Sequence, residues 1–170
     1  MHIVLIQKKN LFEETDKRLA ANFLEAGFGF ETENGAGFHP LEAQYLVKLG
    51  KTSYKKKPAS SKDFTFASAV YNQIRGTGRI VRHYMKETAF LRVYEPGVGR
   101  EEKRPSQLVC LMPGATPSAK SLSEQIKIAH LARLDLIIAS GTEKEIQRTS
   151  PAVSSAEPKI KYYKISSFNF

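Results

Sequence analysis

The 170-residue chain has only one cysteine, Cys110, and no apolar run that approaches the roughly 20 residues of a membrane span. A single thiol cannot form an intramolecular disulfide. It also lies in the apolar run LVCLM, where no cation would favour the thiolate. Cys110 is therefore expected to be a small core residue of a protein in a reducing compartment. The N-terminal stretch MHIVLIQKKN turns polar at Gln7 and is too short for a signal peptide. Together these absences predict a soluble, cytoplasmic protein with no membrane partner.

Signatures of metal and nucleotide binding are missing as well. No two histidines stand at i, i+3 or i, i+4 spacing, and none has a cysteine partner set, which argues against a zinc site at His2, His39, His83 or His130. The sequence has no Walker loop, dinucleotide-binding fingerprint or Gly-x-Ser-x-Gly elbow. GTGR at residues 76–79 is better interpreted as a helix end and turn than as a phosphate loop. EEK at residues 101–103 resembles a nuclease metal motif, but it falls in a charged loop rather than on a strand. We expect no cofactor and no metal.

Basic residues, in contrast, are in excess. Lysine and arginine total 26 against 17 acidic residues, a formal net charge of +9, and the sequence pI is about 9.6. Such a charge raises the local concentration of polyanions and speeds their capture. Charge alone also allows a solvated basic surface that does no more than keep the protein soluble.

The first half of the chain predicts a small α+β domain, residues 1–60. A β-branched run at residues 3–6 indicates a strand, and apolar spacing from Leu11 to Ala26 indicates a helix that Gly27 stops. Glycines then punctuate a loop or hairpin, and Pro40 begins a second helix that ends at Gly50. The basic, apolar-poor segment YKKKPASSK at residues 54–62 is typical of a linker, so we expect the domain boundary there.

The second half, residues 61–170, predicts a small α/β domain with a mixed sheet flanked by two helices. Ser60 or Ser61 can cap a helix that runs to Gly76, and the Ser-x-x-Glu box SLSE at residues 121–124 can open another. The expected order is α-β-β-β-α-β-β, with strands at residues 79–84, 89–94, 106–112, 136–140 and 160–168. The aperiodic span 141–159 is a long loop of the kind that is usually functional or disordered.

An ordered set of motifs fills this second half. It comprises VYNQIRGTGRIVRH (70–83), AFLRVYEPG (89–97), PSQLVCLMP (105–113), IKIAHLARLDLIIA (126–139) and YYKI (162–165). In sequence and order it resembles the C-terminal domain of the archaeal tRNA-splicing endonucleases, and LEAQYLVKLGK (41–51) is similar to a helix of their N-terminal domain. The resemblance implies an enzyme complex that cuts pre-tRNA at bulge–helix–bulge junctions without a metal. A tyrosine deprotonates the 2′-hydroxyl, a histidine protonates the leaving 5′-oxygen and a lysine stabilises the phosphorane. The ends are a 2′,3′-cyclic phosphate and a 5′-hydroxyl.

Transferred residue by residue, the resemblance implies that this chain lacks catalysis. The tyrosine position is Tyr94, but Pro105 stands at the histidine position and Leu134 at the lysine position. Proline offers no proton and leucine no charge, so Leu134 is expected to pack in a core. Lys127 stands where the family clamps a flipped base with arginine, so it keeps the charge without the planar guanidinium. His130 corresponds to a structural histidine packed on the apolar helix face.

The resemblance therefore implies the structural subunit of a heterotetramer, whose partner is a catalytic paralogue with the full Tyr, His and Lys set. In the family the last strand pairs with the partner's equivalent, and an acidic loop inserts into the catalytic subunit of the opposite heterodimer. The implied interface residues are Glu143, Glu145, Tyr162, Tyr163, Ile165, Phe168 and Phe170. Two alternatives stay open. The chain could cleave RNA alone, with Arg104 or His83 as the acid, or it could be a free-standing basic RNA-binding module.

Overall fold

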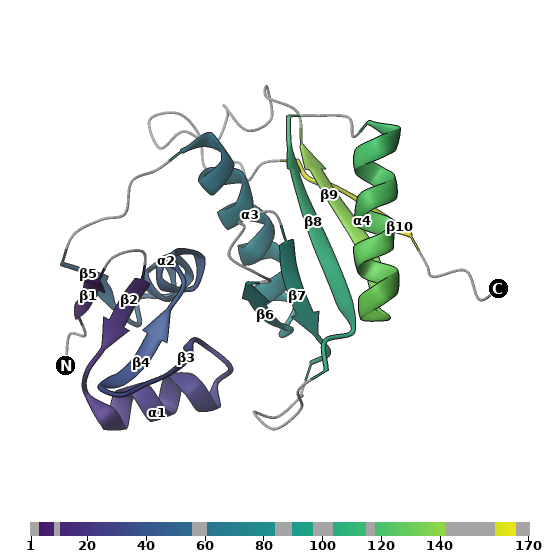
Figure 1. The fold of residues 1–170 in the computed structure, drawn as a ribbon. Coiled ribbons are helices and arrows are strands. Elements are labelled where there is room, and N and C mark those ends of the chain that lie inside the picture. The colour runs from purple at the N-terminus through teal and green to yellow at the C-terminus, as the bar shows by residue number, and fades with distance from the viewer. Residues whose placement is uncertain are drawn as a thin grey trace. The chain divides into compact units, whose positions relative to one another are not determined.

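The computed structural model describes residues 4–8, 11–55, 61–83, 90–96, 104–114, 118–141 and 159–165. Within them the chain forms helices and two mixed sheets, which confirms the expected α/β class (Figure 1). The elements before residue 61 belong to one compact unit and those after it to another. No helix in these stretches is both long enough and apolar enough to cross a membrane.

The first unit is a mixed five-stranded sheet with two helices. Its elements are β1 (Val4–Lys8), β2 (Leu11–Glu14), α1 (Lys17–Glu25), β3 (Phe30–Thr32), β4 (Gly35–Phe38), α2 (Pro40–Lys48) and β5 (Ser53–Tyr54). The strand order is β3-β4-β2-β1-β5, in which β5 is parallel to β1 and the other pairs are antiparallel. Its core gathers aromatic and aliphatic side chains from strands and helices, among them Leu5, Phe12, Leu24, Phe38 and Leu46.

The predicted helix from Leu11 is wrong over its first residues, because Leu11–Glu14 is a strand. Burial alternates along it, with Phe12 and Glu14 inside, and it pairs with β1 on one side and β4 on the other. Two neighbouring strands therefore override the good helix propensity of leucine and glutamate. The helix begins after Asp16, whose carboxylate accepts hydrogen bonds from the first-turn amides.

The second helix begins as predicted, at Pro40, and a buried carboxylate supports its start. His39 is the N-cap, and Glu42 completes a capping box by accepting from the His39 amide at 3.0 Å. The other oxygen of Glu42 accepts from the Gly29 amide at 3.1 Å. One side chain, only 5% exposed, therefore ties the start of α2 to the turn before β3.

The second unit follows the predicted order of elements. These are α3 (Lys62–Gly76), β6 (Ile80–His83), β7 (Phe90–Tyr94), β8 (Gln107–Pro113), α4 (Ala119–Ala132), β9 (Asp135–Gly141) and β10 (Lys161–Ile165). The strand order is β10-β9-β8-β7-β6, with β8 and β9 parallel and every other pair antiparallel. Ser61 caps α3, as expected, by accepting from the Phe64 amide.

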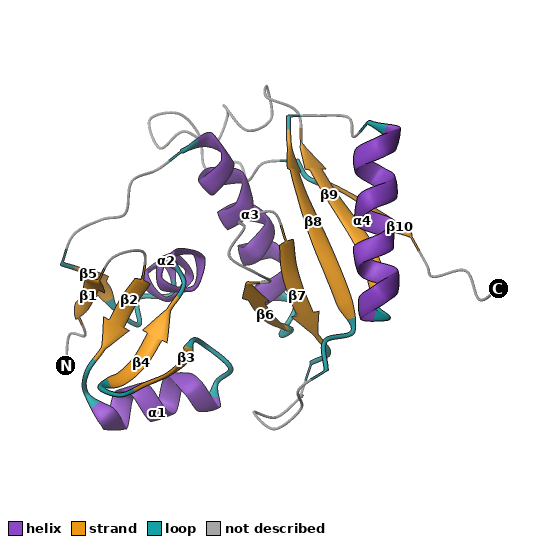
Figure 2. Ribbon diagram, viewed as in Figure 1, coloured by secondary structure: helices purple, strands orange, loops and turns teal. Residues whose placement is uncertain are grey.

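The two helices of this unit cover opposite faces of its sheet (Figure 2). On the α3 face, the ring of Phe66 lies where a side chain at Gly141 would project. On the α4 face, Cys110 and its neighbours pack against Ala129 in one cluster. Cys110 is 2% exposed, which confirms its expected place in a core.

The start of α4 differs from the prediction. Ser118, rather than Ser121 of the SLSE box, is the N-cap and accepts from the Ser121 amide at 3.2 Å. Ser121 instead lies in the first turn, where its hydroxyl accepts from the side-chain Nε2 of Gln125. The helix therefore begins at Ala119, whereas a cap at Ser121 would have left residues 119–121 outside it.

Candidate nucleic-acid interface

Three arginines converge on one end of the second sheet. Strands β6, β8 and β9 run in one direction and β7 in the other, so the first three begin at the end where β7 stops. In Figure 1 this is the lower end of the sheet. Arg79, Arg104 and Arg133 come just before β6, β8 and β9 respectively. We call this end the arginine edge.

The three positions to which the sequence resemblance assigns catalytic residues lie at this edge. The register joins Val93 to Gln107 and Gln107 to Asp135 in one row across β7, β8 and β9. Tyr94 and Leu134 each stand one residue beyond that row, with β7 and β9 two strand spacings, about 10 Å, apart. Pro105 lies two residues before Gln107 at the start of β8.

Two of the three side chains at these positions carry no ionisable group. Tyr94 and Leu134 are 7% and 6% exposed, and Leu134 belongs to the core cluster beneath α4, as the sequence predicts. The nearest hydroxyl in sequence to Pro105 belongs to Ser106, just before β8, and it donates to the Val93 carbonyl at 3.2 Å. Of the side chains at these positions, the tyrosine alone has a proton to exchange, and no cation faces it from Pro105 or Leu134.

Leu134 has a structural role that explains its apolar side chain. The Leu134 amide donates to the Ala129 carbonyl and the Arg133 amide to the His130 carbonyl, with Arg133 in the left-handed conformation (φ 53°, ψ 48°). This is a Schellman motif, whose residue after the left-handed position makes an apolar contact with the helix. Leucine at 134 therefore ends α4 and fills the core beneath it.

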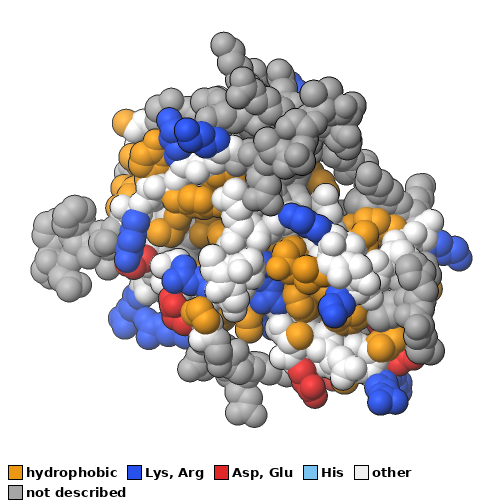
Figure 3. Space-filling view, turned by 180° about the vertical axis from the view of Figure 1, so that it is seen from behind, with side chains coloured by type: hydrophobic (Ala, Val, Ile, Leu, Met, Phe, Trp, Pro, Cys, Tyr) orange, Lys and Arg blue, Asp and Glu red, His pale blue; other side chains and the backbone are white. Residues whose placement is uncertain are grey.

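Arg104 and Arg133 are the free cations of the arginine edge. Both are exposed, and neither forms an ion pair with another residue in the described part of the chain. Arg79 differs, because its guanidinium lies 3.5 Å from the Glu95 carboxylate. Figure 3 shows Lys and Arg side chains spread among hydrophobic and neutral ones on one face of the molecule.

The structure places His83 away from Tyr94. Register pairs Tyr94 with Ile80, at the start of β6, whereas His83 ends that strand, about 10 Å further along. Alternation also puts the two side chains on opposite faces of the sheet. His83 is therefore in no position to act as the acid opposite Tyr94. Arg104 does lie at the edge, but a guanidinium is a poor proton donor at neutral pH.

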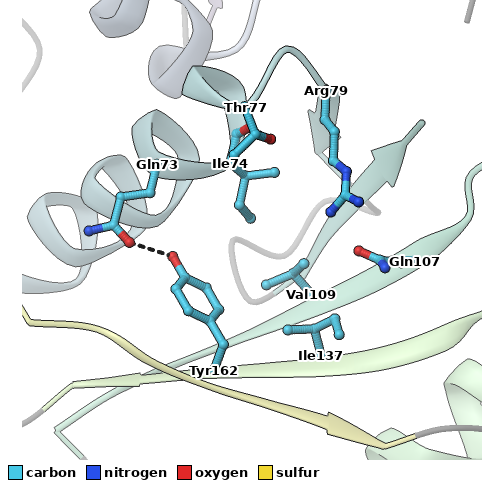
Figure 4. Close-up of a pocket in the computed structure, with 8 residues that line it drawn as sticks. All are labelled: Gln73, Ile74, Thr77, Arg79, Gln107, Val109, Ile137 and Tyr162. Carbon is cyan, nitrogen blue, oxygen red and sulfur yellow. Dashed lines mark hydrogen bonds between the residues drawn. The ribbon is translucent and has the colours of Figure 1, made fainter. Parts of the chain in front are cut away.

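A pocket of about 380 Å³ lies on the α3 face, near the same end of the sheet (Figure 4). Its floor is apolar and its rim polar, and its lining residues are Gln73, Ile74, Thr77, Arg79, Gln107, Val109, Ile137 and Tyr162. The Tyr162 hydroxyl donates to the Gln73 side-chain oxygen at 2.8 Å and closes one side. Gln107 takes part in no side-chain hydrogen bond with another described residue.

On α4, Lys127 and His130 are both exposed. The expectation for Lys127, a cation available to RNA, is compatible with this position. The expectation that His130 packs on the apolar helix face is wrong. The buried side of α4 is centred on Gln125 and Ala129, while Leu131 is 83% exposed. Apolar residues of this helix therefore extend beyond its buried side, and an apolar neighbour does not show that His130 is buried.

Strand β10 is an edge strand with exposed aromatic side chains. Tyr162 and Tyr163 are 41% and 53% exposed, and Ile165 is partly buried against the cluster beneath α4. Lys164 pairs with Asp135 of β9 at 2.8 Å, which anchors the strand to the sheet. The other predicted interface residues, Glu143, Glu145, Phe168 and Phe170, lie outside the described residues.

Sequence reasoning missed Arg79, Arg133 and Gln107 as site residues. Each arginine immediately precedes an apolar run, in RIV and RLDLII, and this recurrence is a signal that could have found them. Gln107 carries no such signal, because only strand register shows which face it takes. Among the described residues, no group of three or more histidine, cysteine or acidic side chains could hold a metal ion.

Comparison with models of known families finds none that matches this sequence, and comparison with curated proteins finds no match either. A function must therefore be inferred from the motifs of the sequence, the arginine edge and the exposed strand β10.

Proposed function

We propose that the chain is the non-catalytic structural subunit of a cytoplasmic tRNA-splicing endonuclease. In this proposal it assembles with a catalytic paralogue, first as a heterodimer and then as a heterotetramer. It helps to hold the pre-tRNA while the paralogue cuts the bulge–helix–bulge junction. The chain itself carries out no proton transfer.

The single observation that carries this proposal is the composition of the arginine edge. A tyrosine is retained at the end of β7, but the neighbouring positions hold Pro105 and the core residue Leu134. General acid–base cleavage of RNA needs a second group that can give a proton and a charge that stabilises the phosphorane. A chain with this fold that lacks both the proton donor and the stabilising charge is what we expect of a non-catalytic subunit.

Two features support the assembly and the RNA. The free guanidinium groups of Arg104 and Arg133 provide phosphate contacts whose energy is independent of base sequence. The exposed tyrosines of β10 lie on a sheet edge, which is a template for pairing with another chain. A paralogue with the same fold would offer an equivalent strand.

One alternative function has specific support. The arginine edge by itself would serve a free-standing RNA-binding module equally well, since phosphate contacts require no partner. The exposed β10 edge favours the assembled subunit instead. Autonomous cleavage has less support because His83 lies on the other face of the sheet from Tyr94.

The decisive experiment is reconstitution. The chain and a paralogue that bears the complete Tyr, His and Lys set would be purified separately and together, then assayed on a bulge–helix–bulge RNA. We expect cleavage to 2′,3′-cyclic phosphate ends only from the mixture. Cleavage by this chain alone would refute the proposal. Full activity of the paralogue without this chain would favour the RNA-binding module.

The interface can be tested by removing residues 163–170. The deletion takes away Tyr163 to Ile165 of the exposed strand but leaves β6 to β9 and both helices. We expect the heterodimer to dissociate at micromolar concentration while circular dichroism still reports a folded chain. Light scattering that still shows an intact complex would place the interface elsewhere.

A further inference from the structure

The pocket on the α3 face has the shape and chemistry of a site for a flat, polar-edged ring. Val109 and Ile137 of the sheet form its floor, and Ile74 of α3 points toward them from the helix side. Its volume of about 380 Å³ lies at the lower end of the range for small-ligand sites, about 300–1,000 Å³. An apolar floor of this kind suits the face of an aromatic ring, whose burial needs no hydrogen bonds.

The rim supplies the polar groups that such a ring needs. The Gln107 carboxamide offers a donor and an acceptor, and no other described residue occupies either. In Figure 4 the Gln107 and Arg79 side chains approach each other across one side of the pocket. A carboxamide can bond to the paired donor and acceptor on the edge of a base.

The surroundings select an anionic ligand that continues outside the pocket. Arg79 belongs both to the pocket and to the arginine edge, and its side chain is 35% exposed beside Glu95. Gln107 of β8 pairs with Asp135 of β9, and Asp135 follows Arg133 and Leu134 in the sequence. A chain of phosphates along the edge would therefore pass the mouth of the pocket.

From these observations we infer that this pocket binds one unpaired nucleobase of an RNA strand whose phosphates lie along the arginine edge. The base stacks on the aliphatic floor, Gln107 bonds to its edge and Arg79 faces the adjacent phosphate. The site lies on the sheet face opposite Tyr94, so it is separate from the positions that correspond to the family's catalytic residues. The inference deepens the proposed function and rests on it for the identity of the RNA.

The test compares single-stranded and base-paired RNA. Fluorescence anisotropy would measure the affinity of the full-length chain for an oligoadenylate of about 12 nucleotides and for a duplex of equal charge. Gln107→Leu removes the carboxamide at similar size, and Ile137→Phe fills the floor. We expect each variant to lower the affinity for the oligoadenylate by about tenfold, as the loss of one base contact does. The affinity for the duplex should stay within about twofold of the wild-type value.

Two controls fix the interpretation. Gln7→Leu makes the same chemical change on β1 of the other unit and should leave both affinities unchanged. Arg133→Asn should weaken both RNAs alike, because it removes a phosphate contact rather than a base contact. If thermal unfolding shows that Ile137→Phe lowers the melting temperature by more than a few degrees, Thr77→Phe replaces it. Thr77 is exposed at the end of α3, so a phenylalanine at this position would fill the pocket from its rim without disturbing the core.

Unchanged oligoadenylate affinity in both pocket variants would overturn the inference, and so would an equal loss for the duplex. Neither result depends on the partner subunit. Failure to reconstitute cleavage would count against the proposed function alone. Loss of base binding with cleavage intact would count against the pocket alone.

Discussion

Arg133 combines an unfavourable backbone conformation with an exposed charge, and this combination can be separated by mutation. Among the described residues it is the one non-glycine position with positive φ, at 53°. An L-residue in the left-handed region pays about 1–2 kcal/mol relative to the right-handed helix. A glycine there would be the usual choice for a helix end. An arginine at such a position is the kind of backbone outlier from which a functional role can be argued.

The expected effect of Arg133→Gly on stability is the difference of two terms. Relief of the left-handed conformation stabilises the folded state by about 1–2 kcal/mol. The greater freedom of glycine in the unfolded chain offsets about 0.5–1 kcal/mol of this. The Schellman bonds at the end of α4 are between backbone groups and survive the change. The net expectation is a gain between zero and about 1.5 kcal/mol, measured by amide exchange in β8 and β9.

The expected effect of the same change on RNA binding has the opposite sign. If Arg133 neutralises one phosphate, its loss makes the slope of log K against log salt shallower by about 0.7–1. Arg133→Asn separates the two effects, since asparagine tolerates the left-handed region and removes only the charge. Arg18→Asn, at an exposed position of α1 in the other unit, is the matched control and should leave the slope unchanged.

Two results would refute this reasoning. An unchanged salt slope in both Arg133 variants would mean that this guanidinium does not contact RNA. A loss of more than about 1 kcal/mol in Arg133→Gly would mean that the arginine side chain stabilises the fold and that its conformation is no cost.

Three further outcomes follow from buried groups. Glu42→Ala should destabilise the first unit by about 2–5 kcal/mol in urea unfolding, because it leaves two amide donors without their acceptor. The control Glu25→Ala, at an exposed site, should cost less than about 0.5 kcal/mol. Burial raises the pKa of the Cys110 thiol from 9.0 to about 11, so a thiol reagent should label the native chain far more slowly than the urea-unfolded chain at pH 8, and equal rates would contradict the buried position. The stability that this neutral thiol contributes is present below pH 9 and is lost as the pH rises from about 9 to 11. In the reconstituted complex Tyr94→Phe should leave the cleavage rate within about threefold. A hundredfold loss would mean that Tyr94 acts as a general base, and it would contradict the proposal that this chain is not catalytic.

The order of elements in the second unit could be predicted because its strands are short apolar runs with clear breaks between them. Predictions went wrong where two readings of the same residues compete locally. Leu11 to Glu14 has helix-forming residues, and only the neighbouring strands β1 and β4 decide for a strand. Ser118 and Ser121 both have cap chemistry, and the choice between them lies in where α4 packs.

The candidate site was predictable only in part, for a related reason. The identities of Pro105 and Leu134 could be weighed from sequence, since the absence of a proton or charge is visible in the residue itself. Which face a side chain takes is a property of register. Gln107 and Leu108 are neighbours in sequence, yet alternation sends one toward the pocket beneath α3 and the other into the cluster beneath α4. His130 fails in the same way, because one step around α4 separates it from the buried Ala129.

Leu134 also bears on the geometry of the arginine edge. A lysine at this position would have to place its ammonium in the core cluster or withdraw it and leave the end of α4 without its apolar contact. Leucine removes that conflict and lets the Schellman motif set the conformation of the residue before it. That residue is Arg133, whose left-handed backbone directs it away from the helix and into solvent at the start of β9. In the proposed function, the leucine that stands in place of a catalytic charge therefore also stabilises the backbone conformation of the exposed Arg133 next to it.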